Sequence, residues 1–239
     1  MRKILFAMSI FCLALSATGY AQKEKNNDND KTKIEGSGNV VTRDVTVQSF
    51  DALTASGVFN VVLKQGSNES LKIEAEDNLQ NLFEVKNEGS SLIVQMKRDS
   101  HFSNKKKIVV YITFKNLKSL ELKMVGNLTA EGNLSFNDLR LDNKSVGSVE
   151  MAVNAQKLNI NNKSVGNLKL SGKADNAIIK HNGVGSLKAS DLVVQSIDID
   201  NDGVGSAEVN AVKELKVRDS FLGKVKNVGP ATAKKKVVI

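Results

Sequence analysis

The sequence has 239 residues, of which 41% are hydrophobic and 5% aromatic, and its formal net charge is +8. Its only cysteine is Cys12, which excludes disulfides, thiolate zinc sites and cysteine nucleophiles from the rest of the chain. No segment offers 18 uninterrupted apolar residues, and this excludes a membrane-spanning helix.

Residues 1–21 have the pattern of a secretory signal peptide. Arg2 and Lys3 precede an apolar stretch over residues 4–17, and small residues lead up to Ala21, after which cleavage is expected. We therefore predict an exported protein of the periplasm or the cell surface, for which nucleic acid is not a partner.

The segment after the predicted cleavage site is expected to be free of lipid and modestly basic. Phe11 is too bulky to precede the cysteine of a lipoprotein processing site, so Cys12 is not expected to carry a lipid. Loss of Arg2 and Lys3 leaves 32 of the 34 basic residues against 26 acidic ones, and thus a net charge of about +6. Residues 22–34 are rich in Lys, Asn and Asp, which predicts a disordered leader.

Residues 35–115 are predicted to form an irregular, strand-rich N-terminal half of the fold. Its segments alternate between apolar and polar residues or run apolar, and only the segment from Asp77 to Phe83 is predicted to be helical. Turns that contain glycine separate the segments. The predicted strands are 40–47, 57–63, 71–75, 92–96 and 108–114.

Residues 116–229 contain a repeat of about 19 residues centred on a Val-Gly pair. Apolar residues stand eight and six places before the glycine and two and four places after it, and this period of two predicts a strand, a tight turn and a second strand. A helix would need spacings of three and four. The repeat glycines are Gly126, Gly147, Gly166, Gly185, Gly205 and Gly223, which are 21, 19, 19, 20 and 18 residues apart.

A single repeat is not expected to fold alone. Five buried apolar side chains contribute roughly 10 kcal/mol, at about 1.5 to 3 kcal/mol each. Ordering some 19 residues costs more, at about 1 to 2 kcal/mol each. The repeats must therefore stack, each pairing its strands in parallel with the next at about 4.8 Å, which predicts an all-β solenoid.

Three positions of the repeat have structural interpretations. Glycine provides the positive φ of a tight corner, and the valine before it is predicted to be a compact wedge in a packed corner. Val165→Asp is then expected to destabilise the array by several kcal/mol. The column four places before the glycine is predicted to face inward as an asparagine ladder; it contains Asn143, Asn162, His181, Asn201 and Asp219.

The N-terminal strand pattern and the repeat together resemble a known family. The segments Phe50-Asp51-Ala52-Leu53, Ser56-Gly57-Val58, 61–66 and 71–79, followed by the glycine-centred coils, resemble the head GIN domain family of secreted bacterial proteins over most of residues 36–229. The resemblance implies a right-handed parallel β-helix, similar to autotransporter adhesin heads and pectin-lyase-like solenoids, without established enzymatic residues. This sequence has Val-Gly-Ser or Val-Gly-Asn corners where relatives often have Gly-Ser-Gly.

One motif suggests calcium binding. Asp198, Asp200, Asp202 and Gly203 match the opening of a calcium-binding loop, but the twelfth position is Val209 instead of a bidentate acid. We therefore interpret the three aspartates as outward polar residues that end at a turn.

Other catalytic signals are weak. His101 and His181 are far apart in sequence, and His181 stands in the asparagine column, so we interpret it as scaffold. No nucleophile elbow and no phosphate loop is present. We predict no catalytic, cofactor-binding or metal site and no cofactor, although Asp142, Glu150 and Asp200 could face acids on adjacent coils, as a glycosidase requires.

The outward charges favour solubility over a shared site. The column three places after the glycine mixes signs, which predicts lateral ion pairs. The lysines at 105–107 and at 234–236, the latter in a basic C-terminal tail over 230–239, are interpreted as solvated. The mixed column contains Glu150, Lys169, Lys188, Glu208 and Lys226.

These observations predict a non-enzymatic exported envelope or cell-surface protein that acts in adhesion or as a scaffold through a rigid solenoid surface. Its partner is an unknown protein or glycan. The alternative is a polysaccharide-binding or polysaccharide-cleaving protein on a pectate-lyase-like scaffold. The sequence leaves open a homo-oligomer, such as a trimer by analogy with adhesin heads, but it shows no coiled-coil stalk.

Overall fold

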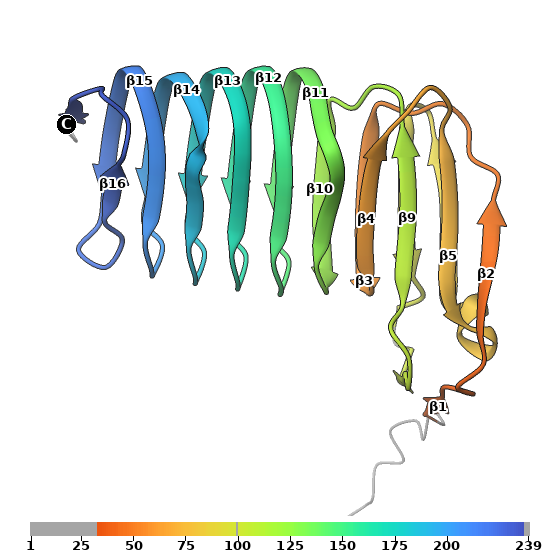
Figure 1. Ribbon diagram of the computed structural model, residues 1–239. Helices are drawn as coiled ribbons and strands as arrows, with labels where there is room; N and C mark the ends of the chain where they lie inside the picture. Colours follow the sequence, from red (N-terminus) through yellow and green to blue (C-terminus); the bar gives the residue numbers. More distant parts are fainter. Residues whose placement is uncertain (1–32, 99, 237–239) are drawn as a thin grey trace, which may run out of the picture. The chain divides into compact units, whose positions relative to one another are not determined.

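The computed structural model describes residues 33–98 and 100–236. The predicted signal peptide and all but the last two residues of the predicted leader lie outside this part of the chain. The structure is 67% strand and 3% helix and forms a β-solenoid of about six turns, with coils of roughly 20 residues (Figure 1). The predicted all-β solenoid is confirmed.

The described part of the chain contains 17 strands and one 3-10 helix, η1, at Asp77–Leu82. The strands are β1 (Ile34–Glu35), β2 (Val40–Val45), β3 (Ala52–Val58), β4 (Asn60–Gln65), β5 (Ser70–Glu76), β6 (Phe83–Glu88), β7 (Ser91–Met96), β8 (Phe102–Ser103), β9 (Val109–Phe114), β10 (Ser119–Val125), β11 (Leu128–Asn143), β12 (Val149–Asn162), β13 (Leu168–His181), β14 (Leu187–Asn201), β15 (Ala207–Asp219), β16 (Val225–Asn227) and β17 (Ala233–Lys235).

Two walls of strands enclose the core, and the long strands β11 to β15 contribute to both. One wall begins with β6, β7, β3 and β10, and the other with β2, β5, β9 and β4. Strand β11 pairs with β4 near its start and with β10 near its end, so it belongs to both walls. Each of β12 to β15 likewise spans both walls and pairs in parallel with the long strand before it. The predicted strand-turn-strand unit is therefore one bent strand per coil, closed by a tight corner. In Figure 1 the corner loops follow one another along the lower edge.

The N-terminal half combines parallel and antiparallel pairing. Strands β2 and β5, β5 and β9, and β6 and β7 are antiparallel, whereas β3 and β4 pair in parallel with β7 and β9. The predicted helical turn at Asp77 is confirmed as η1. The single strand predicted over 57–63 is wrong, because the chain turns at Phe59 and places β3 and β4 in opposite walls. Strand β6 was not expected from the sequence.

The apolar columns of the repeat form the core. Leu158, Ile160, Leu168 and Leu170 are all buried, as their places before and after Gly166 predict. Equivalent residues stack in register from coil to coil, for example Val149, Leu168, Leu187 and Ala207. The period of two therefore identifies the inward face correctly.

The corner glycines are required both by backbone conformation and by close packing. Gly147, Gly166, Gly185 and Gly205 have φ between +132° and +138°, which L side chains rarely adopt. A Cβ at any of them would lie 2.0–2.2 Å from the carbonyl oxygen of the corner glycine in the preceding coil. Gly223 departs from the predicted column, because a Cβ there would meet the carbonyl oxygen of Gly203.

The valines before these glycines do not pack in the corner as predicted. Val146, Val165, Val184 and Val204 pair through single parallel bridges, but each is about half exposed. The preceding serines or glycines turn inward instead, since Ser145, Ser164, Gly183 and Gly203 are buried. Val165→Asp therefore buries no charge, and the structure removes the reason for expecting a large destabilisation.

The predicted asparagine ladder is present inside the corner. Asn143, Asn162, His181 and Asn201 are fully buried. Asn143 Nδ2 donates to Asn162 Oδ1 at 2.8 Å, and Asn162 Nδ2 lies 2.8 Å from His181 Nδ1. The oxygens of Asn143 and Asn162 also accept from the hydroxyls of Ser145 and Ser164. The ladder thus links successive coils through side chains as well as backbone.

The two ends of the described chain are both paired. β1, which includes the last residue of the predicted leader, pairs in parallel with β8. At the other end β17 pairs in parallel with β15, so this part of the predicted tail continues the solenoid. Lys235 contacts Asp219 but stays 67% exposed, so its interpretation as solvated holds. That interpretation is wrong for Lys236, whose side chain is 26% exposed and whose ammonium group contacts Asp198 and Asp200.

Candidate binding surfaces

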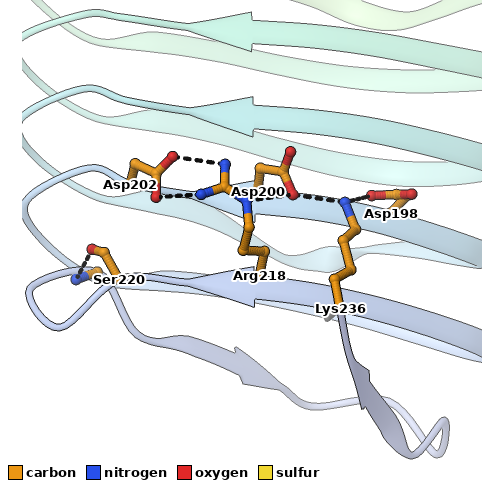
Figure 2. A network of polar contacts seen from close by, with 7 residues as sticks. Asp198, Asp200, Asp202, Arg218, Ser220 and Lys236 are labelled. Atoms are coloured by element: carbon orange, nitrogen blue, oxygen red, sulfur yellow. Dashed lines mark hydrogen bonds and ion pairs between the residues drawn. The ribbon is translucent and has the colours of Figure 1, made fainter. Parts of the chain in front are cut away.

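The three aspartates that resemble a calcium loop are held by basic side chains from the last coil. Figure 2 shows Arg218 between Asp202 and Asp200, and Lys236 between Asp200 and Asp198. Arg218 donates two hydrogen bonds to Asp202, at 2.9 and 2.7 Å. Among residues 33–98 and 100–236, no three His, Cys, Asp or Glu side chains form a group that could hold a metal ion.

The electrostatics of this cluster indicate a structural role. Partial burial raises the pKa of Asp200, but hydrogen bonds from Lys236 and Arg218 outweigh it and hold that pKa below its usual range. Burial lowers the pKa of Lys236, and its contacts with Asp198 and Asp200 more than reverse that effect. Both groups are therefore charged at neutral pH, and the cluster attaches β17 to the preceding coils.

The outward acids that a glycosidase would need are also neutralised by cations. Arg140 Nε donates to Asp142 Oδ2 at 2.6 Å, and the hydrogen bond lowers the pKa of Asp142. Glu150 contacts Lys169 at 2.6 Å, and Glu208 contacts Lys226 at 3.2 Å, both between adjacent coils. The lateral ion pairs predicted for the mixed column are confirmed at these two positions. Exposed pairs of this kind contribute about 0 to 1 kcal/mol each.

The structure does not bring the two histidines together. His101 is exposed beside β8, whereas His181 is fully buried in the ladder of the solenoid. Burial lowers the pKa of His181, so the ring is neutral at physiological pH. The side chains of Lys105, Lys106 and Lys107 are exposed, and the backbone amides of the first two donate to the buried carboxylate of Glu76.

An open hollow of about 740 Å³ lies where the regular coils begin. The bend of β11 pairs with β12 on one side, but β10 starts only at Ser119 and β4 ends at Gln65. Within the described residues no strand therefore covers the other side of the bend, and the ends of several segments surround the gap. The lining residues are Ser49, Phe50, Asp51, Gln65, Glu69, Ser90, Lys115 to Lys118 and Ser135 to Asp138.

Polar contacts fix the walls of the hollow. Gln65 Nε2 donates to the carbonyl oxygens of Lys115 and Ser135 at 3.0 and 3.1 Å, and its Oε1 accepts from the Ser135 amide at 2.7 Å. Phe136 forms part of the floor and stacks on Phe114, with ring centroids 5.9 Å apart and 12° between the planes. The hollow is therefore preformed, with an apolar floor and a polar rim.

Two of the carboxylates around the hollow are paired with lysines. Ser49 Oγ donates to Glu69 at 2.6 Å and lowers its pKa, and Lys115 lies 3.4 Å from the same carboxylate. Lys118 lies 2.8 Å from Asp51, and their hydrogen bond lowers the pKa of Asp51 and raises that of Lys118. Asp138, which also lines the hollow, is exposed. Because both lysines and two of the three carboxylates are engaged with one another, the rim favours an uncharged polar ligand over a free ion.

Sequence reasoning did not identify this hollow. Its residues come from five segments, and their spacing carries no motif. One signal was available within the repeat: Phe136 stands in register with Ala155 and Ala174 of the next two coils. A large aromatic side chain in a column of alanines marks the coil at which the regular stacking begins.

A second surface is a row of exposed valines along the corner. We call Val58, Val125, Val146, Val165, Val184 and Val204 the valine row. Val58 pairs with Val125 through β3 and β10, and the other members pair through successive bridges. Each member is 43–53% exposed, so the row is a continuous apolar stripe.

The described chain contains no helix of the length and apolarity needed to cross a bilayer.

The family model "Putative auto-transporter adhesin, head GIN domain" matches residues 49–231. No curated protein matches the sequence.

Solved structures of bacterial proteins share the fold. A protein from Bacteroides fragilis described as a putative adhesin is 28% identical, with a TM-score of 0.73 over 85% of this chain and 100% of that chain. One from Parabacteroides distasonis, described as a putative lipid binding protein, is 16% identical with a TM-score of 0.58 over 86% and 100%. A putative adhesin from Parabacteroides merdae is 22% identical with a TM-score of 0.53 over 86% and 99%. The last two likenesses concern the fold alone.

Proposed function

Because the chain belongs to the head GIN domain family of auto-transporter-adhesin-like proteins, we propose that it is an exported, non-enzymatic protein of the cell envelope or cell surface that adheres to a partner through its rigid solenoid. One observation carries the choice of binding site: the preformed hollow at the start of the regular coils. The other conspicuous polar groups, at Asp142, Asp200 and Glu150, are occupied by ion pairs within the protein.

The lining of the hollow supports a glycan as the partner. Hydroxyl and amide side chains such as Ser90, Asn116 and Asn137 surround an apolar floor, and lysines neutralise the carboxylates of Glu69 and Asp51. Sugar rings offer apolar faces and many hydroxyls, which suits such a lining. Polysaccharide binding is therefore the second candidate function, and a panel of lyase and hydrolase substrates tests the alternative of cleavage.

The test is to fill the hollow without disturbing the fold. Asn137 is exposed in the bend of β11, and Gln156 occupies the equivalent position one coil later, outside the residues that line the hollow. Asn137→Trp is expected to reduce binding of the labelled protein to bacterial and host surfaces or glycans by at least tenfold. Gln156→Trp, the matched control, is expected to bind as the native protein does.

Two results would overturn the proposal. Equal binding by native protein and Asn137→Trp, with unchanged melting temperatures, would remove the hollow as the site. Turnover of any polysaccharide, including uronic-acid polymers, in a lyase and hydrolase panel would remove the non-enzymatic role.

A further inference from the structure

We propose that the valine row is a self-association surface, through which two copies of this chain pack with their solenoid axes antiparallel. This inference goes beyond the proposed function and does not depend on the hollow, which lies at the opposite bend of the coil. The first observation is the residue type at the corner. Each row position is about half exposed and is a valine, although threonine would have the same branched shape with a polar group.

The row has a geometry that another copy matches. Its members follow one another at the spacing of paired strands, about 4.8 Å. A partner that contacts every member in register must present side chains at the same spacing, and a second solenoid of this chain does so. Since the same patch can serve on both copies, the contact closes as a two-fold dimer.

The exposed apolar area is large enough for such a contact. The last coil adds Phe221 and Leu222, which are 89% and 64% exposed in the corner turn that follows that of Val204. The row and this turn together expose several hundred Å² of apolar surface, a patch of the size that marks interaction sites on monomeric proteins. A standard interface buries about 800 Å² on each partner.

The charges beside the row favour the antiparallel direction. In the column two residues before each valine, Ser56 is followed by Lys123, Lys144 and Lys163, then by Asn182 and Asp202. Parallel packing about a two-fold axis along the solenoid would place these lysines opposite uncharged residues two places after each valine, such as the partner's Ser148. Antiparallel packing about Val165 places Lys123 opposite the partner's Asp202, Lys144 opposite the partner's Asn182 and Lys163 opposite its own copy, so only this direction brings opposite charges together. Glu121 and Arg218 already contact these charges, so they set direction more than affinity.

Cysteine cross-linking tests the arrangement. Because Cys12 is the only cysteine, full-length chain with Cys12→Ser is a clean background. Val165→Cys, on the two-fold axis, is expected to form a disulfide dimer by itself under mild oxidation. Val125→Cys and Val204→Cys are each expected to stay uncross-linked alone and to form a heterodimeric disulfide when mixed. Efficient cross-linking of Val125→Cys alone would overturn the antiparallel arrangement.

Sedimentation provides the second measurement. The native protein is expected to show a concentration-dependent dimer, and Val165→Asp is expected to weaken it at least tenfold with little change in melting temperature. Ile178→Asp, a matched control at an exposed apolar position on a wall, should dimerise as the native protein does. Native protein that stays monomeric up to high micromolar concentration, or equal dimerisation of Val165→Asp, would overturn the proposal.

Discussion

Asn162 Nδ2 donates a hydrogen bond to His181 Nδ1 across adjacent coils, at 2.8 Å, in the closed interior of the solenoid. Because the amide can only donate through this nitrogen, the neutral imidazole carries its proton on Nε2. That atom and both polar atoms of the Asn201 side chain are buried without a hydrogen-bond partner in the described part of the chain. The ladder that begins at Asn143 is therefore interrupted after His181.

Replacing the histidine is expected to repair this interruption. His181→Asn would let the amide column run from Asn143 to Asn201, and each restored hydrogen bond contributes about 1 kcal/mol. We expect a melting temperature a few degrees higher, measured by circular dichroism. His101→Asn, at an exposed position, is the control and should leave the melting temperature unchanged. A destabilised His181→Asn protein would show that the ring fills a space that an amide cannot.

The same histidine is expected to make stability depend on pH. Burial lowers the pKa of His181 in the folded protein, so the unfolded chain takes up the proton more readily. Stability should then fall as pH decreases below about 6.5, the value for a free histidine, until the folded pKa is reached. Urea unfolding between pH 8 and pH 5 measures this. The difference between native protein and His181→Asn should widen as pH falls, and parallel curves would contradict the prediction.

The corner glycines offer a matched comparison of strain and clash. Gly166→Ala places a Cβ 2.2 Å from the Gly147 carbonyl oxygen at a φ of +134°. We expect this variant to lose more than about 3 kcal/mol, or to fail to fold, since both the backbone and the coil spacing must change. Gly132→Ala has a φ of +73° and no neighbour within 4 Å, so about 1 kcal/mol is expected. Similar losses of stability in the two variants would contradict the close approach of the coils.

Residues on the two sides of one corner should differ sharply in their effect on stability. Leu168 is fully buried, and Leu168→Ala is expected to cost about 2 to 5 kcal/mol in the free energy of unfolding. Val165, three residues earlier, is about half exposed, and Val165→Ala should change stability by about 0.5 kcal/mol or less in dilute protein. Chemical denaturation of both variants measures the contrast, and a large effect at Val165 would restore the packed corner that the sequence suggested.

A buried carboxylate is expected to release the N-terminal segment at acid pH. Burial raises the pKa of Glu76, but backbone amides of Gly38, Lys105 and Lys106 donate to it and hold the pKa below its ordinary value. Its contribution to stability is therefore complete above about pH 4.3, the value for a free glutamate, and is lost as pH falls through the folded pKa. Hydrogen exchange at the Gly38 amide measures this.

Two variants of the same strand separate the carboxylate from its surroundings. Glu76→Gln should expose the Gly38 amide to exchange already at neutral pH, because the amide side chain offers one acceptor oxygen instead of two. Glu74→Gln, on the outward face of β5, should exchange as the native protein does. Equal protection of Gly38 in native protein and Glu76→Gln would contradict the role of the carboxylate.

The sequence by itself determined the repeat, its inward apolar columns, the asparagine ladder and the lateral ion pairs, because these follow from local period and from stacking of like on like. Only the tertiary structure decided three features. These are the placement of β3 and β4 in opposite walls, the exposure of the valine row, and the hollow beside Phe136. The period of two says which residues alternate, but it cannot say which way a corner turns. Nor can it say which distant segments meet where the regular coils begin. Lys236, directly after the last strand, shows the same limit, since it became structural only when stacking placed it beside Asp198 and Asp200.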